Sequence, residues 1–353
     1  MLLARVMLLS WMAMVGRGMA TTRALLPKKY ILSHAQMKSL MHRVKENNDL
    51  GNLRLPAPVK SFNVADHGDD PNANELVPFI VDDKVMGYVS PEFAALCAQH
   101  RDVFFIKSFV GLCLVPALAS REIEERTAAV ARVTLDLKNR GFISGWRNEL
   151  LPVLESFSDT PALLVERAAY PFFGMKGYGV HVNGFVVGEG EEAGEMRLWV
   201  ATRSKTKQTW PGMLDHIVAG GQPHGISPTE NVVKECGEEA GIPPSLAAEA
   251  LPVSAVSYTG VDEGGRLKRD CLFCYDLQLP ASFIPIAEDG EVESFQLQTM
   301  DWVLDKLTTG GPGGYKTNCN LVVIDFLIRH GVIAPESPHY LDLLASLRDN
   351  QCS

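Results

Sequence analysis

No stretch of this sequence is long and apolar enough to cross a membrane as a helix. The run from Val6 to Val15 ends at Gly16 and Arg17, short of the roughly 18 apolar residues that a span requires. The chain also lacks an excess of positive charge, because 33 Lys and Arg face 42 Asp and Glu, for a formal net charge of -9. This balance excludes a protein held on nucleic-acid polymers by phosphate contacts, so we expect neither a nucleic-acid polymer partner nor a membrane span.

Internal repeats and a paired cysteine framework are also missing. The seven cysteines are an odd number scattered over a long chain, which is typical of reduced thiols in a core rather than of disulfides. What is present is an ordinary globular composition, 46% apolar and 21% charged, in 353 residues. That length predicts about two domains.

Charge is unevenly distributed along the chain. Residues 1–45 contain eight basic residues and no Asp or Glu, which leaves 25 basic against 42 acidic residues in the remainder. With Arg5, Arg17 and Arg23, residues 1–29 fit the Arg-bearing, acid-poor pattern of transit peptides to chloroplasts or mitochondria. The apolar run after Arg5 also fits a secretory signal, but the cysteine usage favours an organelle, with a cytoplasmic location as the alternative.

The first half of the chain predicts a small α/β N-terminal module over residues 30–160. Apolar residues at helical spacing indicate a helix over about 30–48. Two apolar runs around residues 82–84 predict a β-hairpin, and the Ser-Pro-Glu that follows starts another helix at Pro91. A longer helix is expected over about 122–139.

The second half is richer in strand signals and predicts a domain over residues 165–335, followed by a C-terminal helix and tail over 336–353. Alternating and β-branched runs indicate strands over 178–187, 196–203, 213–218, 254–261, 271–279 and 292–297, and helices over 318–330 and 340–348. Strands interleaved with few helices indicate a mixed sheet with helices packed on its faces.

Residues 219–243 concentrate the features that carry chemistry. A capping box at residues 227–230 predicts a helix, on which Glu235, Glu238 and Glu239 stand at i, i+3 and i+4 and share one face. An isolated triplet of this kind is usually a solvated face. The Gly-rich loop before it and the glycine directly after it favour instead a site for a hard divalent cation, which prefers clustered oxygen ligands.

This stretch resembles the Nudix box, G-x5-E-x7-R-E-U-x-E-E-x-G-U, where U is apolar. The residues that take its defined positions are Gly220, Ile226, Lys234, Glu235, Cys236, Glu238, Glu239, Gly241 and Ile242. Two of them depart from the pattern, since Ile226 replaces a glutamate and Lys234 an arginine. Lys234 keeps the charge but loses the planar fork of arginine, so the departures change the local salt-bridge network rather than the metal ligands.

The resemblance covers most of residues 30–335. It is to the Nudix hydrolases related to the N-terminal part of fungal thiamin pyrophosphokinase fusions and to plant organellar Nudix hydrolases, and it rests also on YGVHVNGFV and LWVATRSKTKQTWPGMLDHIVAGG. It implies an α/β/α sandwich around a mixed sheet, preceded by the small N-terminal module. It also implies a hydrolase, dependent on Mg²⁺ or Mn²⁺, that cleaves the diphosphate of damaged thiamin diphosphates to the monophosphate plus phosphate.

The family pattern further assigns roles to individual residues. It gives metal binding to the carboxylates of Glu235, Glu238 and Glu239 and to the backbone carbonyl of Gly220. Glu238 or Glu239 would act as the base, and an acid from a later loop, Glu291 or Glu293, is the other candidate. The competing interpretation of that loop is a solvated turn.

Substrate binding is expected just before the box. The phosphates would accept charge-assisted hydrogen bonds from Arg203, Lys205 and Lys207. The ring of Trp210 would stack on a heteroaromatic ring of the substrate or anchor its own turn. Oxidised nucleoside diphosphates of the 8-oxo-dGDP type are the alternative small-molecule substrates within the same fold. A noncatalytic ligand-binding or interaction module is the alternative of another class, and the three retained glutamates argue against it.

Overall fold

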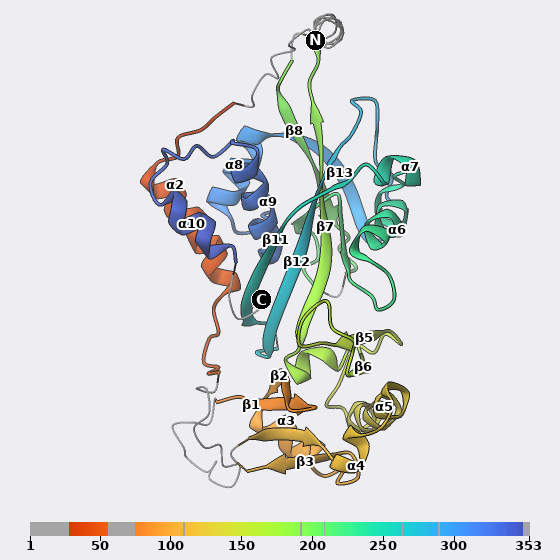
Figure 1. The fold of residues 1–353 in the computed structure, drawn as a ribbon. Helices are drawn as coiled ribbons and strands as arrows, with labels where there is room; N and C mark the ends of the chain where they lie inside the picture. The colour runs from red at the N-terminus through yellow and green to blue at the C-terminus, as the bar shows by residue number, and fades with distance from the viewer. Residues whose placement is uncertain are drawn as a thin grey trace, which may run out of the picture.

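The computed structural model describes residues 28–55, 75–108, 110–190, 193–207, 209–262, 264–288 and 290–348, so the predicted targeting segment lies almost wholly outside it. Within these ranges a four-stranded sheet and a seven-stranded sheet each carry their own core (Figure 1). None of the helices described combines the length and the apolar character that crossing a bilayer requires. The molecule therefore divides into a small α/β part and a larger sandwich.

The smaller part is built on strands in the order β2-β1-β4-β3. Its elements are β1 (Val77–Val81), β2 (Lys84–Val89), α3 (Pro91–Cys97), β3 (Phe104–Lys107), β4 (Gly111–Leu114), α4 (Pro116–Ala119) and α5 (Ile123–Asn139). The predicted hairpin is present, and Asp82 and Asp83 at its turn both have positive φ, as a tight two-residue turn requires. Beyond α5 come β5 (Leu150–Val153), β6 (Leu163–Glu166) and the 3₁₀ helix η2 (Tyr170–Phe173), which lead into the larger part.

The larger sheet has the order β11-β12-β7-β8-β13, with β10 paired to β7 and β9 to β8. Its strands are β7 (Lys176–Val187), β8 (Met196–Arg203), β9 (Leu214–Asp215), β10 (Val218–Gly221), β11 (Leu251–Val261), β12 (Leu267–Gln278) and β13 (Val292–Thr299). β7 runs parallel to β12 and antiparallel to β8 and β10, so the sheet is mixed.

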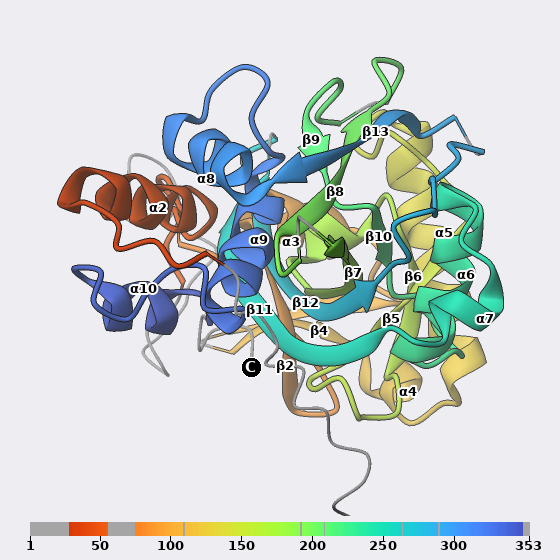
Figure 2. The same ribbon diagram turned by 90° about the horizontal axis from the view of Figure 1, so that it is seen from above.

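Helices cover both faces of this sheet (Figures 1 and 2). One face carries α6 (Pro228–Ala240) and α7 (Pro244–Ala247); the other carries α2 (His34–Asn47), α8 (Met300–Thr309), α9 (Thr317–Arg329) and α10 (Tyr340–Ser346). Because side chains alternate along a strand, Val180 and Val182 of β7 join the core under α6, whereas His181 and Asn183 face the α9 side. The expected α/β/α sandwich is confirmed.

Two details differ from the sequence prediction. The first helix, expected within the N-terminal module, packs instead against α8 and α9, where Met37, Leu40 and Val44 enter the core of the larger part. The single strand expected over 213–218 is divided into β9 and β10, because the chain leaves β8 and pairs next with β7. Local periodicity carries no information on either choice of partner.

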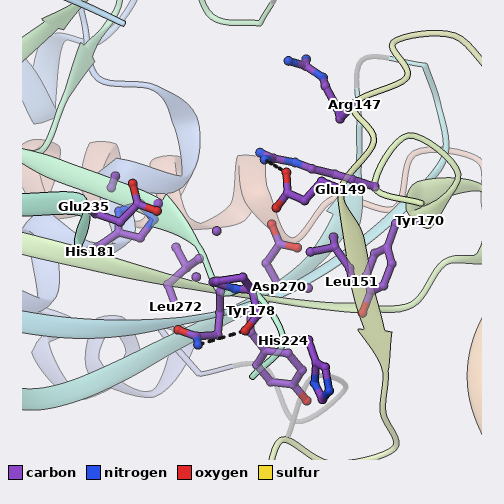
Figure 3. A pocket seen from close by; sticks show the side chains of 18 of the residues that line it. Arg147, Glu149, Leu151, Tyr170, Tyr178, His181, His224, Glu235, Asp270 and Leu272 are labelled. Carbon is purple, nitrogen blue, oxygen red and sulfur yellow. Dashed lines mark hydrogen bonds and ion pairs between the residues drawn. The ribbon is translucent and has the colours of Figure 1, made fainter. Parts of the chain in front are cut away.

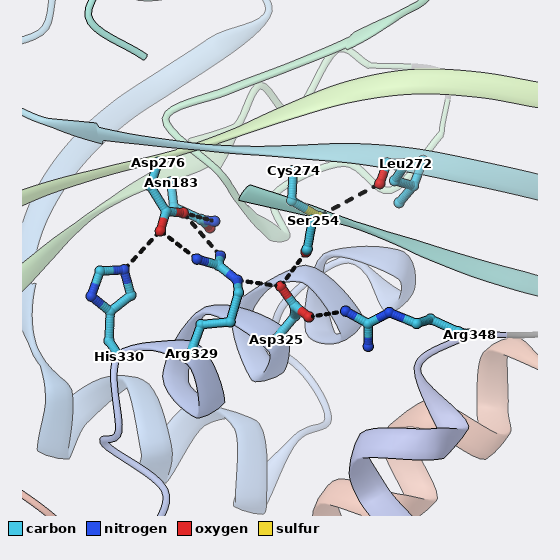
Figure 4. A network of polar contacts seen from close by, with 9 residues as sticks. All are labelled: Asn183, Ser254, Leu272, Cys274, Asp276, Asp325, Arg329, His330 and Arg348. Carbon is cyan, nitrogen blue, oxygen red and sulfur yellow. Dashed lines mark hydrogen bonds and ion pairs between the residues drawn. The ribbon is translucent and has the colours of Figure 1, made fainter. Parts of the chain in front are cut away.

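A buried ionic network ties α9 to the sheet (Figure 4). The guanidinium of Arg329 contacts Asp276 of β12 and Asp325 one helical turn earlier, and Arg348 lies 2.8 Å from the other oxygen of Asp325. Both carboxylates are almost fully buried, at 5% and 1% exposure. Burial alone would raise the pKa of Asp276, but hydrogen bonds from His330 and Arg329 hold it below its usual range, so the group stays ionised.

Replacing Arg329 by alanine would leave two buried carboxylates without their shared counter-ion. We expect the free energy of unfolding to fall by about 3–5 kcal/mol, the range for breaking one partner of a buried pair. Arg132→Ala is the control, since Arg132 and Asp102 form an exposed, solvent-screened pair whose loss should leave the stability almost unchanged. Urea unfolding of both variants checks the difference, and equal losses would contradict the role given to Arg329.

Candidate active site

The loop and helix of the box fold as their local signals predict. Ser227 caps α6, with its hydroxyl accepting from the backbone N–H of Glu230 and the Glu230 carboxylate accepting in return from Ser227. Gly241 ends the helix with φ of 61°, a left-handed conformation that glycine adopts without strain. The two caps therefore fix the position of α6, and its glutamates lie beside the end of β10.

The three glutamates differ in environment. The side chain of Glu238 is 54% exposed and that of Glu235 15% exposed, and Lys234 Nζ lies 2.6 Å from the former carboxylate and 3.2 Å from the latter. Glu239 accepts a hydrogen bond of 2.9 Å from the backbone N–H of Ala219 in β10. Burial raises the pKa of Glu239 to about 8 and raises the pKa of Glu235 above its usual range.

Burial therefore disfavours the charged forms of these two carboxyl groups, and a bound cation would stabilise them. Gly220 allows the backbone of β10 to approach Glu235 closely, because a Cβ built on this glycine would fall 2.4 Å from the carboxyl carbon of Glu235. Backbone and carboxylate thus meet where a side chain would otherwise stand. The donors are all oxygen atoms, which is the set a hard divalent cation prefers, so the residues fit the metal that the resemblance implies.

The carboxylates open into a cavity of about 1070 Å³ between the two parts of the molecule. In Figure 3, Glu235 and His181 lie on one side, whereas Arg147, Glu149, Leu151 and Tyr170 come from the smaller part on the other, with Tyr178 and Asp270 between them. An aromatic wall, defined here as Phe157, Tyr178 and Phe273, adjoins this space. Phe157 packs 4.9 Å from Tyr178 and 4.7 Å from Phe273, measured between ring centroids.

The residues predicted to bind substrate do not all reach this cavity. Lys207 lines it and pairs with Glu291, which also lines it. Arg203 lines it too, but its guanidinium lies 2.7 Å from the buried Asp215 and donates to the carbonyl of Trp210. Lys205 is exposed and does not line the cavity.

Trp210 and Glu293 lie outside the set of described residues around this space. Trp210 occupies a turn with φ of 55°, and its backbone carbonyl anchors Arg203. Glu293 pairs with the exposed Lys205 at 3.1 Å. Of the two late acids proposed from the sequence, the structure therefore brings only Glu291 to the glutamates of α6.

The sequence did not identify several cavity residues. Arg147 and Phe157 come from the smaller part, Lys268 and Asp270 from β12, and Lys316 from the end of the loop before α9. None belongs to a motif, and their convergence depends on how the two sheets meet. The glycine-rich run before Lys316 is a signal for a loop but not for its position.

The glycine pair at the end of β10 offers a direct test of this arrangement. Gly220→Ala would push the Glu235 carboxylate aside, so we expect Mn²⁺ binding to weaken about tenfold or more with little change in thermal stability. Gly221→Ala is the matched control, because nothing lies within 4 Å of a Cβ there. Calorimetric titration with Mn²⁺ gives the affinities. Equal affinities for the two variants would show that Glu235 is not a ligand.

The chain is similar to known proteins over most of its length. A family model described as a domain of unknown function, DUF4743, matches residues 58–177. Nudix hydrolase 24, chloroplastic, of Arabidopsis thaliana is 47% identical over 279 residues, covering 79% of this chain and 74% of that protein. Nudix hydrolase 20, chloroplastic, of the same plant is 47% identical over 286 residues with the same coverage.

Among solved structures, the NUDIX domain of Shewanella oneidensis NrtR, complexed with ADP ribose, is 12% identical with a TM-score of 0.35. The match covers 47% of this chain and 99% of that one. The family itself is established by the two plant relatives, whose identity extends over most of both chains. Together with the box on α6, this similarity shows that the chain belongs to the Nudix hydrolases.

Proposed function

We propose that this hydrolase uses Mg²⁺, or Mn²⁺ in its place, to cleave the diphosphate of damaged thiamin-diphosphate-like substrates to the monophosphate plus phosphate. One observation carries the proposal. The same cavity is lined by the carboxylates of α6, by the aromatic rings of Phe157 and Tyr178 and by an acidic side chain, Asp270. A substrate with a diphosphate at one end and a cationic aromatic ring at the other matches these features.

The α6 end of the cavity supports the hydrolytic part. Glu235, Glu238, Glu239 and the carbonyl of Gly220 would hold the metal, which when bound neutralises phosphate oxygens and lowers the pKa of a coordinated water. Glu238 or Glu239 would accept the proton of the attacking water, and Glu291 is the candidate acid from a later loop. Lys207 and Lys316, at the cavity surface, would position the phosphate oxygens by charge-assisted hydrogen bonds.

The opposite end supports the thiamin part. A thiazolium ring is both aromatic and positively charged, so it gains from stacking on Tyr178 and Phe157 and from a nearby carboxylate. Asp270 lines the cavity, where Lys268 and the hydroxyl of Tyr258 contact its carboxylate, and would supply this negative charge. An oxidised purine nucleotide would use the same rings but gain nothing from Asp270, so it is the second candidate.

A substrate panel tests the function. Purified protein with Mg²⁺ is offered thiamin diphosphate, its oxidised analogues, 8-oxo-dGDP, ADP-ribose and NADH. We expect monophosphate to be released fastest from the oxidised thiamin diphosphates, and Glu238→Gln to lower the rate about 100-fold or more. Glu249→Gln makes the same charge change at an exposed position outside the cavity and should leave the rate unchanged.

The outcomes separate the parts of the proposal. If none of the compounds releases a monophosphate, the proposal that the protein hydrolyses diphosphates of these classes is overturned. Turnover of nucleotides alone would overturn the thiamin assignment and leave the metal site standing.

We also propose that the protein acts in an organelle, with the chloroplast favoured over the mitochondrion and the cytoplasm as the alternative. The basic, acid-free segment of residues 1–29 supports this location. The two plant relatives, which are named as chloroplastic, support it as well. The mature protein in an organelle fraction should then lack the predicted targeting segment and begin near residue 30. N-terminal sequencing checks this, and an intact Met1 on protein found in the cytosol would contradict it.

A further inference from the structure

Three soft donor groups from distant parts of the chain meet on the α9 side of the large sheet. His181 lies on β7, His216 follows β9, and Cys319 lies in the first turn of α9; Figure 2 labels these three elements. Their exposures are 4%, 3% and 0%. One ligand atom from each lies within 4.8 Å of the others.

Both imidazoles present an unused nitrogen in this buried space. His181 Nδ1 and His216 Nε2 have no hydrogen-bond partner, although burial makes an unpaired polar atom costly. The two rings pack edge to face with centroids 5.0 Å apart.

The protonation states suit metal binding. Burial lowers the pKa of His216 to about 4 and that of His181 well below its usual value, so both rings are neutral and offer lone pairs. Burial, together with the neighbouring Asp215, raises the pKa of the Cys319 thiol. That thiol donates to Asp215 Oδ1 at 2.9 Å, whereas the other oxygen of Asp215 pairs with Arg203.

We propose that His181, His216 and Cys319 form a second metal site, which binds Zn²⁺ or a similar borderline-soft ion and is separate from the carboxylate site on α6. Two imidazoles and a thiolate prefer such an ion, whereas the all-oxygen donors on α6 prefer Mg²⁺. Binding would draw the three donors to about 3.5 Å from one another, the spacing of tetrahedral zinc ligands.

The charge balance of this step is simple. Cys319 loses its thiol proton to solvent as the sulfur–metal bond forms, and the hydrogen bond from the thiol to Asp215 is lost. Asp215 keeps its ion pair with Arg203. His181 also lines the active-site cavity, so a water molecule from that side completes the coordination.

The site would join three elements that the active site depends on. It links β7, the segment between β9 and β10, and α9. Strand β10 carries Gly220 and also Ala219, whose backbone N–H donates a hydrogen bond to Glu239. The second site is therefore expected to stabilise the framework of the box rather than to take part in the reaction.

Cobalt(II) is the probe for the test, because a cobalt–thiolate bond gives a charge-transfer band in the near ultraviolet that carboxylate ligands do not give. We expect reduced full-length protein to take up about one equivalent of Co²⁺ with this band, and Zn²⁺ to displace it. Cys319→Ser should abolish the band, and His216→Asn should weaken Co²⁺ binding about 100-fold or more. Cys274→Ser, a buried thiol outside the cluster, should keep it.

The test does not depend on the hydrolase assignment. Glu238→Gln, which removes a ligand of the carboxylate site, should retain the band. Circular dichroism establishes that each variant is folded. Folded wild-type protein without a thiolate band at saturating Co²⁺ would overturn the proposal, whatever the variants do, and so would a band that survives Cys319→Ser.

Discussion

The burial of β7 on both faces is the constraint on which the rest of the structure depends. Helices pack against each side of this strand, so its alternating side chains enter two different layers. Val180 and Val182 support α6 and its glutamates, whereas His181 and Asn183 face the polar groups near α9. The two valines therefore fix the position of α6, whereas His181 and Asn183 contribute to the buried polar groups on the α9 side.

Charge is then distributed around this strand in a way that would let an acidic protein bind the anionic substrate proposed above. The carboxyl groups of Glu235 and Glu239 are largely buried, and their pKa values are raised. Lys234 neutralises part of this charge from one side. A divalent cation would reverse the sign of the local field, which the net charge of -9 does not reveal.

The smaller part of the molecule contributes to the site as well as to the fold. It has its own core, and its segment between α5 and β6 supplies Arg147, Glu149 and Phe157 to the cavity. In the function proposed above, the box would supply the groups that suit a diphosphate, and the side chains of the smaller part would distinguish one substrate ring from another. Such a division of roles would explain why a Nudix box alone identifies the chemistry but not the substrate.

The sequence by itself determined the box helix, its caps and the shared face of Glu235, Glu238 and Glu239, because these depend on spacings of three or four residues. It also indicated most strands of the large sheet. Only the tertiary structure decided that α2 joins the larger core, that Arg203 pairs with Asp215, and that Lys205 does not line the cavity. It alone brought Cys319 to Asp215, which lies 104 residues earlier. Such contacts follow from how layers pack, and no local pattern records which distant residues a layer will bring together.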